Sequence, residues 1–297
     1  MSRTDPSWDL YRSFLAVLRE GSLSGAARAL NLTQPTIARH VAMLEDAVGC
    51  TLFLRSQRGL AATQAALELQ PYAEALAATA AALVRAASGQ GDAVRGTVRV
   101  TASEVVGAEV LPPILTTLHE LHPGLVVELV LSNEVEDILQ RDADIAVRMV
   151  EPVQQALVVR RIGDIPLGLH AHPAYLARRG TPRTLEELEH HSLIGFDRET
   201  PAIRNVLRRM PWLERTRFAL RTDSDLAQLA AIRAGFGIGV CQVPLARREP
   251  RLVRLLPDRF ALNLGTWLVM HEDLRSTPRC RAVFDGLASG LKSHLSP

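Results

Sequence analysis

The sequence predicts an α/β protein that carries a separate, mostly helical domain at its N-terminus. Three observations support this fold class. Apolar residues between positions 22 and 48 recur every three or four residues, as in helices that pack one side on a core. An alanine-rich stretch with the same spacing follows from residue 63 to residue 88. From residue 96 onward, strand-like and helix-like patterns alternate, which is typical of an α/β sheet.

Length and composition fit two packed cytoplasmic domains. The chain has 297 residues, of which 47% are hydrophobic. It begins without a cationic run followed by an apolar one, and no apolar segment is long enough to span a bilayer. We therefore expect neither a signal peptide nor a membrane protein. The cysteines, Cys50, Cys241 and Cys280, form no Cys-x-x-Cys unit, which favours structural thiols in a reducing compartment over a redox sensor.

Residues 22–44 predict a helix, a tight turn and a second helix. The first helix has a small apolar stripe of Ala26, Ala27 and Leu30, which allows close crossing. Thr33 is a good N-cap for the second helix, and Pro35 falls in its first turn, where a missing N–H costs nothing.

The second helix has two different sides. The core side carries Ile37, Val41, Leu44 and Val48. The opposite side carries Gln34, Pro35, Thr36, Arg39 and Met43. Glutamine can bond adenine, arginine can bond guanine or phosphate, and threonine can meet a thymine methyl. The pattern is that of a recognition helix for the major groove of DNA, although an ordinary helical hairpin remains an alternative.

A short segment after the two helices is rich in arginine. Residues 51–60 place Arg55 and Arg58 just before Gly59, in a length that fits a hairpin wing. Cations beside a recognition helix suit contacts to the phosphate backbone, and a solvated loop is the alternative.

Residues 8–70 resemble the N-terminal winged helix of the LysR-type transcriptional regulators. The resemblance rests on Phe14, Gly21-Ser22-Leu23, Ala26-Ala27, Leu30, Thr33-Gln34-Pro35, Arg39, Leu44-Glu45, Gly49, Leu52-Phe53, Arg55, Arg58 and Thr63. The family usually has Ser-Gln-Pro, a serine before the arginine and Leu-Thr-x-Ala-Gly, where this chain has Thr33, Ala38 and residues 62–66. The resemblance implies a DNA-binding domain over residues 1–62, double-stranded operator DNA as partner, a homodimer or homotetramer, and action with RNA polymerase at promoters.

The stretch from residue 63 to residue 91 predicts a long helix and a hinge. The helix has a narrow apolar stripe of Leu69, Tyr72, Leu76, Ala80, Leu83 and Ala87. We interpret it as a dimerisation helix, with packing on its own domain as the alternative. Pro71 should kink or delay this helix. Residues 88–92, Ser-Gly-Gln-Gly-Asp, predict a flexible hinge.

The rest of the chain predicts a mostly parallel sheet with helices on its faces. Strands are expected at residues 97–102, 125–131, 144–148, 167–170, 218–221 and 238–241. Helices are expected at residues 111–121 and 225–234, with a short helix ending at Leu139. Gly235 should form the C-cap of the helix before it.

Residues 96–290 resemble the effector-binding domain of the same family, which is similar to periplasmic solute-binding proteins. Matching stretches are Leu111-Pro112, residues 122–124, residues 144–146, residues 172–176 and Ala234-Gly235-x-Gly237. The resemblance implies a domain over residues 92–297 with one lobe at about 92–164 and 268–297 and another at about 165–267. The chain would cross between them near 162–166 and 264–269.

In that resemblance a small-molecule effector binds between the lobes, and residues at strand ends face the cleft. The candidates are Ser103, Asn133, Val147, Arg148 or Met149, Phe196 and Thr222. The helix after Ser103 could offer N–H groups to an anion, and Arg148 suits a carboxylate, so an organic acid is the expected effector class. An exposed salt bridge is the alternative for Arg148.

Other polar clusters point to no cofactor, metal or catalysis. His170 and His172 should share one strand face and His190-His191 follows, but no cysteine or carboxylate has ligand spacing beside them. No nucleophile, zinc-protease or phosphate-loop motif occurs. An exported binding protein would need a signal peptide, and an enzyme would need convergent acid–base groups. A DNA-binding regulator is therefore favoured over both.

Overall fold

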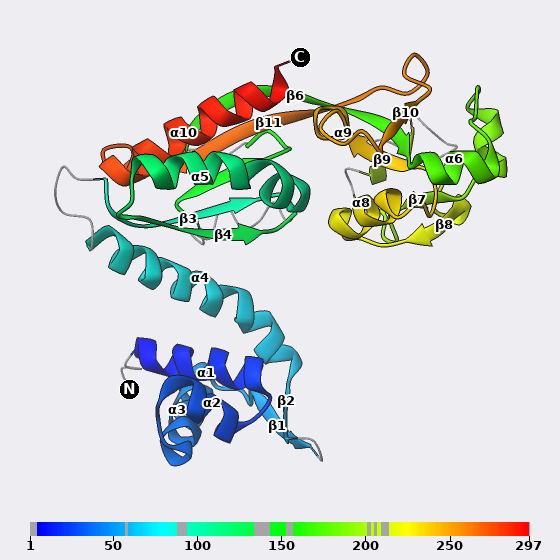
Figure 1. Cartoon of the computed structure of the whole chain (residues 1–297). Helices are drawn as coiled ribbons and strands as arrows, with labels where there is room; N and C mark the ends of the chain where they lie inside the picture. The colour runs from blue at the N-terminus through cyan, green and yellow to red at the C-terminus, as the bar shows by residue number, and fades with distance from the viewer. Residues whose placement is uncertain are drawn as a thin grey trace. The chain divides into compact units, whose positions relative to one another are not determined.

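The computed structural model of the protein describes residues 5–56, 59–87, 94–133, 143–152, 157–200, 203–204, 207–208 and 214–296. The chain forms two compact units (Figure 1). One extends to residue 86, and the other is made of residues 87–138 and 143–297.

The first unit contains the predicted pair of helices. Its elements are α1 (Trp8–Glu20), α2 (Leu23–Leu30), α3 (Gln34–Val48), β1 (Phe53–Ser56), β2 (Gly59–Ala62) and α4 (Gln64–Ala87). Thr33 caps α3 as predicted, because its side chain accepts the Thr36 N–H, and Pro35 lies in the first turn. Asn31, in the left-handed region, ends α2 and forms the turn.

One apolar cluster holds this unit together. Phe14, Ile37, Leu44 and Leu52 are wholly buried in it, and Val48 packs at its edge. Burial of each such side chain stabilises the unit by about 1.5–3 kcal/mol. The predicted core side of α3 is therefore confirmed.

The long helix α4 starts one residue later than the predicted stretch and runs without interruption. Thr63 caps it by accepting the Ala66 N–H. Pro71 lies inside the helix, so the expectation that it delays the helix is wrong. Ala66 and Ala73 are buried on the cluster of the first unit, which confirms packing of α4 on its own domain over this part. The predicted hinge at 88–92 lies outside the described residues.

The second unit is α/β. Its elements are β3 (Gly96–Ala102), a π-helical turn (Val106–Val110), α5 (Leu111–Leu121), β4 (Leu125–Leu131), β5 (Ile145–Arg148), β6 (Leu157–Ala171), α6 (Pro173–Arg179), β7 (Leu193–Gly195), β8 (Phe218–Arg221), α8 (Asp225–Arg233), β9 (Gly239–Gln242), α9 (Val243–Ala246), β10 (Val253–Leu255), β11 (Leu262–His271) and α10 (Pro278–Leu295), with 3₁₀ turns at Glu186–His190, Arg215–Arg217 and Glu272–Leu274. The predicted short helix ending at Leu139 lies outside the described residues.

The main sheet is mixed rather than mostly parallel. Over the described residues it has seven strands, in the order β10-β6-β11-β5-β3-β4 with β9 also paired to β6. The pairs β3–β4 and β3–β5 are parallel as predicted, and so is the separate pair β7–β8. The correction comes from β6 and β11, which pair antiparallel with each other and with their other neighbours.

Two strands join two lobes of this unit. The register of β6 and β11 runs from Leu167↔Leu262 to Leu157↔His271 and shifts between Thr266 and Trp267. Around one end lies a cluster of β3, β5, α5 and α10, which we call lobe one, and α5 and α10 lie side by side on one face of its sheet (Figure 1). Around the other end lie the clusters of β7 to β10, α6 and α8, which we call lobe two. The predicted crossings fall within β6 and β11.

The end of α8 also forms as predicted. Gly235 has φ +73°, and the N–H groups of Gly235 and Phe236 donate to the carbonyls of Ile232 and Ala231. This pair of bonds closes the helix in a Schellman motif. Within the described part of the chain, no helix is long and apolar enough to cross a membrane.

Candidate functional site

The outer side of α3 is solvent-facing. Gln34, Pro35 and Arg39 are exposed, and Thr36 is half-buried. The Thr36 hydroxyl lies 2.8 Å from that of Thr33, so it takes part in the helix cap. Met43, one turn after Arg39, is 51% exposed. The predicted separation of a core side and a polar side of α3 is therefore confirmed.

A hairpin follows α3 and is fixed to it by a carboxylate. Strands β1 and β2 pair antiparallel, with Arg55 opposite Leu60. Glu45 of α3 accepts hydrogen bonds from the N–H groups of Leu52, at 2.7 Å, and Phe53, at 3.2 Å. These two bonds hold the start of β1 in place against α3.

A second tie joins the hairpin to the turn between α1 and α2. The Leu60 N–H donates to the Gly21 carbonyl at 2.9 Å. Gly59 has φ +123°, and a Cβ there would lie 2.6 Å from the Gly21 carbonyl oxygen, so only glycine fits. Arg55 is exposed on β1, as a phosphate contact requires, whereas Arg58 lies outside the described residues.

Helix α4 carries several large apolar side chains that are exposed. Tyr72 is 76% exposed, Leu76 42% and Leu83 69%, and Leu67 and Val84 are exposed as well. Half of the predicted stripe therefore lies at the surface of the first unit. Large apolar side chains grouped in this way typically mark an interaction surface.

On lobe one, the predicted cleft residues have different environments. Ser103 is half-buried directly after β3, and Val147 is wholly buried in the core of the lobe. Asn133 accepts the Glu104 N–H at 3.1 Å. Arg148 is only 4% exposed, and its guanidinium donates to the Thr101 hydroxyl at 3.1 Å. The alternative of an exposed salt bridge for Arg148 is thus wrong.

On lobe two, the candidates lie where β7 and β8 end. Phe196 packs edge-on against Phe218 with ring centres 5.0 Å apart. The Thr222 N–H donates to the Gly195 carbonyl, and its hydroxyl accepts the Ser224 N–H. Ser224 also bonds Glu104 of lobe one, so the structure brings the segments of Ser103 and Thr222 together. Sequence reasoning missed Glu104, because a carboxylate beside a predicted site residue carries no local signal.

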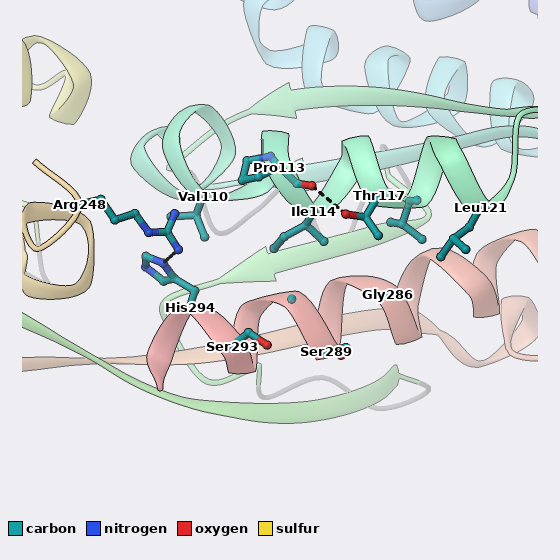
Figure 2. A pocket seen from close by; sticks show the side chains of 12 residues that line it. Val110, Pro113, Ile114, Thr117, Leu121, Arg248, Gly286, Ser289, Ser293 and His294 are labelled. Atoms are coloured by element: carbon teal, nitrogen blue, oxygen red, sulfur yellow. Dashed lines mark hydrogen bonds between the residues drawn. The ribbon is translucent and has the colours of Figure 1, made fainter. Parts of the chain in front are cut away.

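A groove of about 500 Å³ lies elsewhere, between α5 and α10 (Figure 2). Its walls are mainly apolar, and none of the predicted effector residues lines it. At one end Arg248 of lobe two donates to Nδ1 of His294 at 2.8 Å. Burial of this ring lowers the pKa of His294 to about 4, which keeps it neutral and able to accept that bond.

The structure contradicts one expectation for the histidines and supports a structural role for Cys241. His170 is buried, its ring bonds the Gly168 carbonyl, and burial lowers its pKa to about 4. His172 instead caps α6, so the expectation that the two share a strand face is wrong, because β6 ends at Ala171. No cluster of three or more potential metal ligands occurs among the described residues. Burial raises the pKa of the Cys241 thiol to about 12, which supports a structural role.

Two family models match the chain. The model described as "Bacterial regulatory helix-turn-helix protein, lysR family" matches residues 8–67. The model described as "LysR substrate binding domain" matches residues 91–292. The chain therefore belongs to the LysR family of transcriptional regulators, with an N-terminal helix-turn-helix DNA-binding domain and a C-terminal effector-binding domain.

The similarity to known proteins extends over nearly the whole length of this chain. The chain is 27% identical over 284 residues to the probable HTH-type transcriptional regulator LtrA of Klebsiella pneumoniae, covering 93% of this chain and 92% of that protein. The full-length structure of the Vibrio cholerae virulence activator AphB has a TM-score of 0.62 at 21% identity, with 95% and 99% coverage. The LysR family regulator CbnR, in complex with its target DNA, has a TM-score of 0.66 at 19% identity, with 96% and 100% coverage.

Proposed function

We propose that this regulator binds double-stranded operator DNA by placing α3 in the major groove, with Gln34, Pro35, Thr36 and Arg39 toward the bases. The observation that carries the proposal is the exposed polar side of α3 opposite its buried side. Arg55 on the hairpin, together with Arg58, would contact phosphates and set the orientation of the domain. The structure of CbnR with its target DNA supports this use of the fold.

The regulator would act as a homodimer or homotetramer. The exposed row of Tyr72, Leu76 and Leu83 on α4 supports this, because a second α4 would bury it. Two copies place two recognition helices on two half-sites, which doubles the phosphate contacts. Operator DNA also implies a cytoplasmic location and contact with RNA polymerase at promoters, and this role needs no catalytic residue or cofactor.

The effector would be a small molecule, with an organic acid as the favoured class, held between the lobes. Ser103, Asn133, Val147, Arg148, Phe196 and Thr222 remain the proposed contacts. Support comes from the strand-end positions of Ser103 and Asn133 and from a guanidinium held by Thr101. The lobe boundaries at residues 164 and 268 and the domain boundaries at 62 and 91 stay predictions.

The DNA proposal is tested with a binding sequence selected from a random pool of duplexes. Arg39→Ala should weaken binding to that sequence by about 1–3 kcal/mol and relax the preference at one base position. Arg19→Ala, which removes an exposed arginine of α1, is the charge-matched control. Equal affinity of Arg39→Ala and wild type for the selected duplex would contradict the assignment.

A test of the proposed effector contacts first requires a ligand. A thermal-shift screen of small acids and aromatic compounds can find one, because a ligand at a hundred times its Kd stabilises by about 2.7 kcal/mol. Calorimetry of Ser103→Ala and Arg148→Ala should then show weakened binding. Wild-type affinity in both variants would remove these residues from the site and leave the DNA-binding proposal intact.

A further inference from the structure

The helix α8 of lobe two contacts lobe one at its N-terminal end. The Glu104 carboxylate accepts hydrogen bonds from the Ser224 hydroxyl at 2.9 Å and from the Leu226 N–H at 3.2 Å. Beside it, the Asn133 amide donates to the Asp225 carboxylate at 3.1 Å. A carboxylate at a helix N-terminus is stabilised by the exposed N–H groups of the first turn.

The C-terminal end of the same helix contacts lobe one through an ion pair. Arg233, the last residue of α8, donates to both Glu109 oxygens at 2.7 and 2.8 Å. The same guanidinium bonds Glu249, which belongs to lobe two. These bonds from Arg233 hold the pKa of Glu109 below its usual range. The side chains of Arg233 and Glu109 are 33% and 24% exposed, so the ion pair is partly shielded from solvent.

Between the two ends lies an apolar contact. Val105 of lobe one packs against the lobe-two cluster that contains Leu229 and Ile232 of α8. Glu104, Val105 and Glu109 all belong to the helical segment 104–110, which follows β3. Helix α8 therefore bonds this one segment at both ends, and the segment also packs against the cluster to which α8 belongs.

We propose that α8 and segment 104–110 form a latch that holds the two lobes together in a closed arrangement and opens as a unit. Helix α8 is a nine-residue element that moves as a rigid unit, so a rotation of lobe two about an axis away from the helix displaces both of its ends. Both ends therefore break together.

The latch also adjoins the proposed effector contacts, and this step rests on the proposed function. Ser103 precedes Glu104, and Asn133 bonds both halves of the latch, accepting the Glu104 N–H and donating to the Asp225 carboxylate. A ligand that engages the Asn133 amide removes its bond to Asp225. Such a ligand shifts the lobes only by its difference in affinity for the closed and open arrangements.

The test compares two glutamates that bind the same arginine. Glu109→Gln weakens the ion pair between the lobes, whereas Glu249→Gln weakens the pair within lobe two. Hydrogen exchange is measured at the Leu226 amide, at the opposite end of α8, in the full-length protein without ligand or DNA. If the latch opens as a unit, Glu109→Gln should speed exchange at Leu226 roughly fivefold, and Glu249→Gln should change it less than about twofold.

Two outcomes would overturn the proposal. An unchanged Leu226 rate in Glu109→Gln means that the ends open independently. Equal acceleration in both variants means that Arg233 only stabilises lobe two. Glu104→Gln provides a second measurement, because it should speed exchange at the Arg233 end of α8 while the exchange of β3 stays unchanged. Because no ligand or DNA is present, the result does not depend on the proposed effector.

Discussion

The contact between Glu45 and the hairpin gives the sharpest prediction for the DNA-binding unit. One Glu45 oxygen accepts two backbone N–H groups, those of Leu52 and Phe53, and both residues are buried. Glu45→Ala leaves both donors without this partner at the base of the hairpin. Glu45→Gln keeps an oxygen in place and removes only the charge.

The magnitude follows from the number of bonds. A buried donor that loses its partner costs about 1–3 kcal/mol, so Glu45→Ala should lower the free energy of unfolding of this unit by about 2–6 kcal/mol. Charge-assisted bonds exceed neutral ones by about 1 kcal/mol, so Glu45→Gln should cost about 1–2 kcal/mol. The hairpin should also lose its fixed direction, and affinity for DNA of any sequence should fall in Glu45→Ala.

Native-state hydrogen exchange of buried α3 amides measures the opening of this unit separately from the rest of the chain. The control is Asp46→Ala, which removes a neighbouring acidic side chain that is exposed. A Glu45→Ala variant within about 0.5 kcal/mol of Asp46→Ala would contradict the role assigned to Glu45, since surface substitutions fall in that range.

Three further predictions concern the hairpin, assembly and pH. Arg55→Ala should weaken binding to all DNA sequences alike and reduce the salt slope by about one unit, and a change at one base position without a change in slope would instead assign a base contact. Changing Leu76 and Leu83 together to Glu should give monomers in sedimentation. The control Ala81→Glu, which lies about 140° from Leu76 around the axis of α4, should leave the dimer intact. A double variant that is still dimeric would place the interface elsewhere. The pKa of His294 is about 4 in the fold and about 6.5 when unfolded, so the unfolded chain takes up the proton first as pH falls from 6.5 to 4. The free energy of unfolding should therefore drop by up to about 3 kcal/mol over that window. His294→Gln should make this drop smaller and leave the part due to His170. The same pH profile of stability in His294→Gln and wild type would contradict this prediction.

Local signals account for the parts that sequence reasoning predicted. The helix pair forms where Thr33 caps α3 and an apolar stripe of period 3.6 follows, and these depend on neighbours within one or two turns. The same holds for β3, β4 and the Gly235 cap. Long-range pairing accounts for the errors. The antiparallel β6–β11 pair joins residues about a hundred positions apart. The position of Arg148 beside Thr101 likewise depends on the pairing of β5 with β3, which are distant in the sequence.

The helix α10 was not predicted for a specific physical reason. It contains Gly286 and Gly290, and each glycine in a helix interior costs about 1 kcal/mol relative to alanine. The structure explains their presence, because a Cβ would lie 2.5 Å from Leu118 at the first position and 2.6 Å from Ile114 at the second. Close approach of α5 outweighs the local preference. Glu45 and Glu104 were missed as site residues for a related reason, since each acts through a partner distant in the chain.

The path of the chain through the two lobes also sets an order of assembly during synthesis. Lobe two lies between β6 and β11, so all of its own elements precede the last strand of the sheet. The core of lobe one, in contrast, needs Val283, Phe284, Leu287 and Leu291 of α10. The first domain to be completed on the ribosome is thus the helix-turn-helix unit, and the last is lobe one. A stop codon just before residue 278 would leave the DNA-binding unit whole while removing part of the core that its effector-binding domain needs to fold.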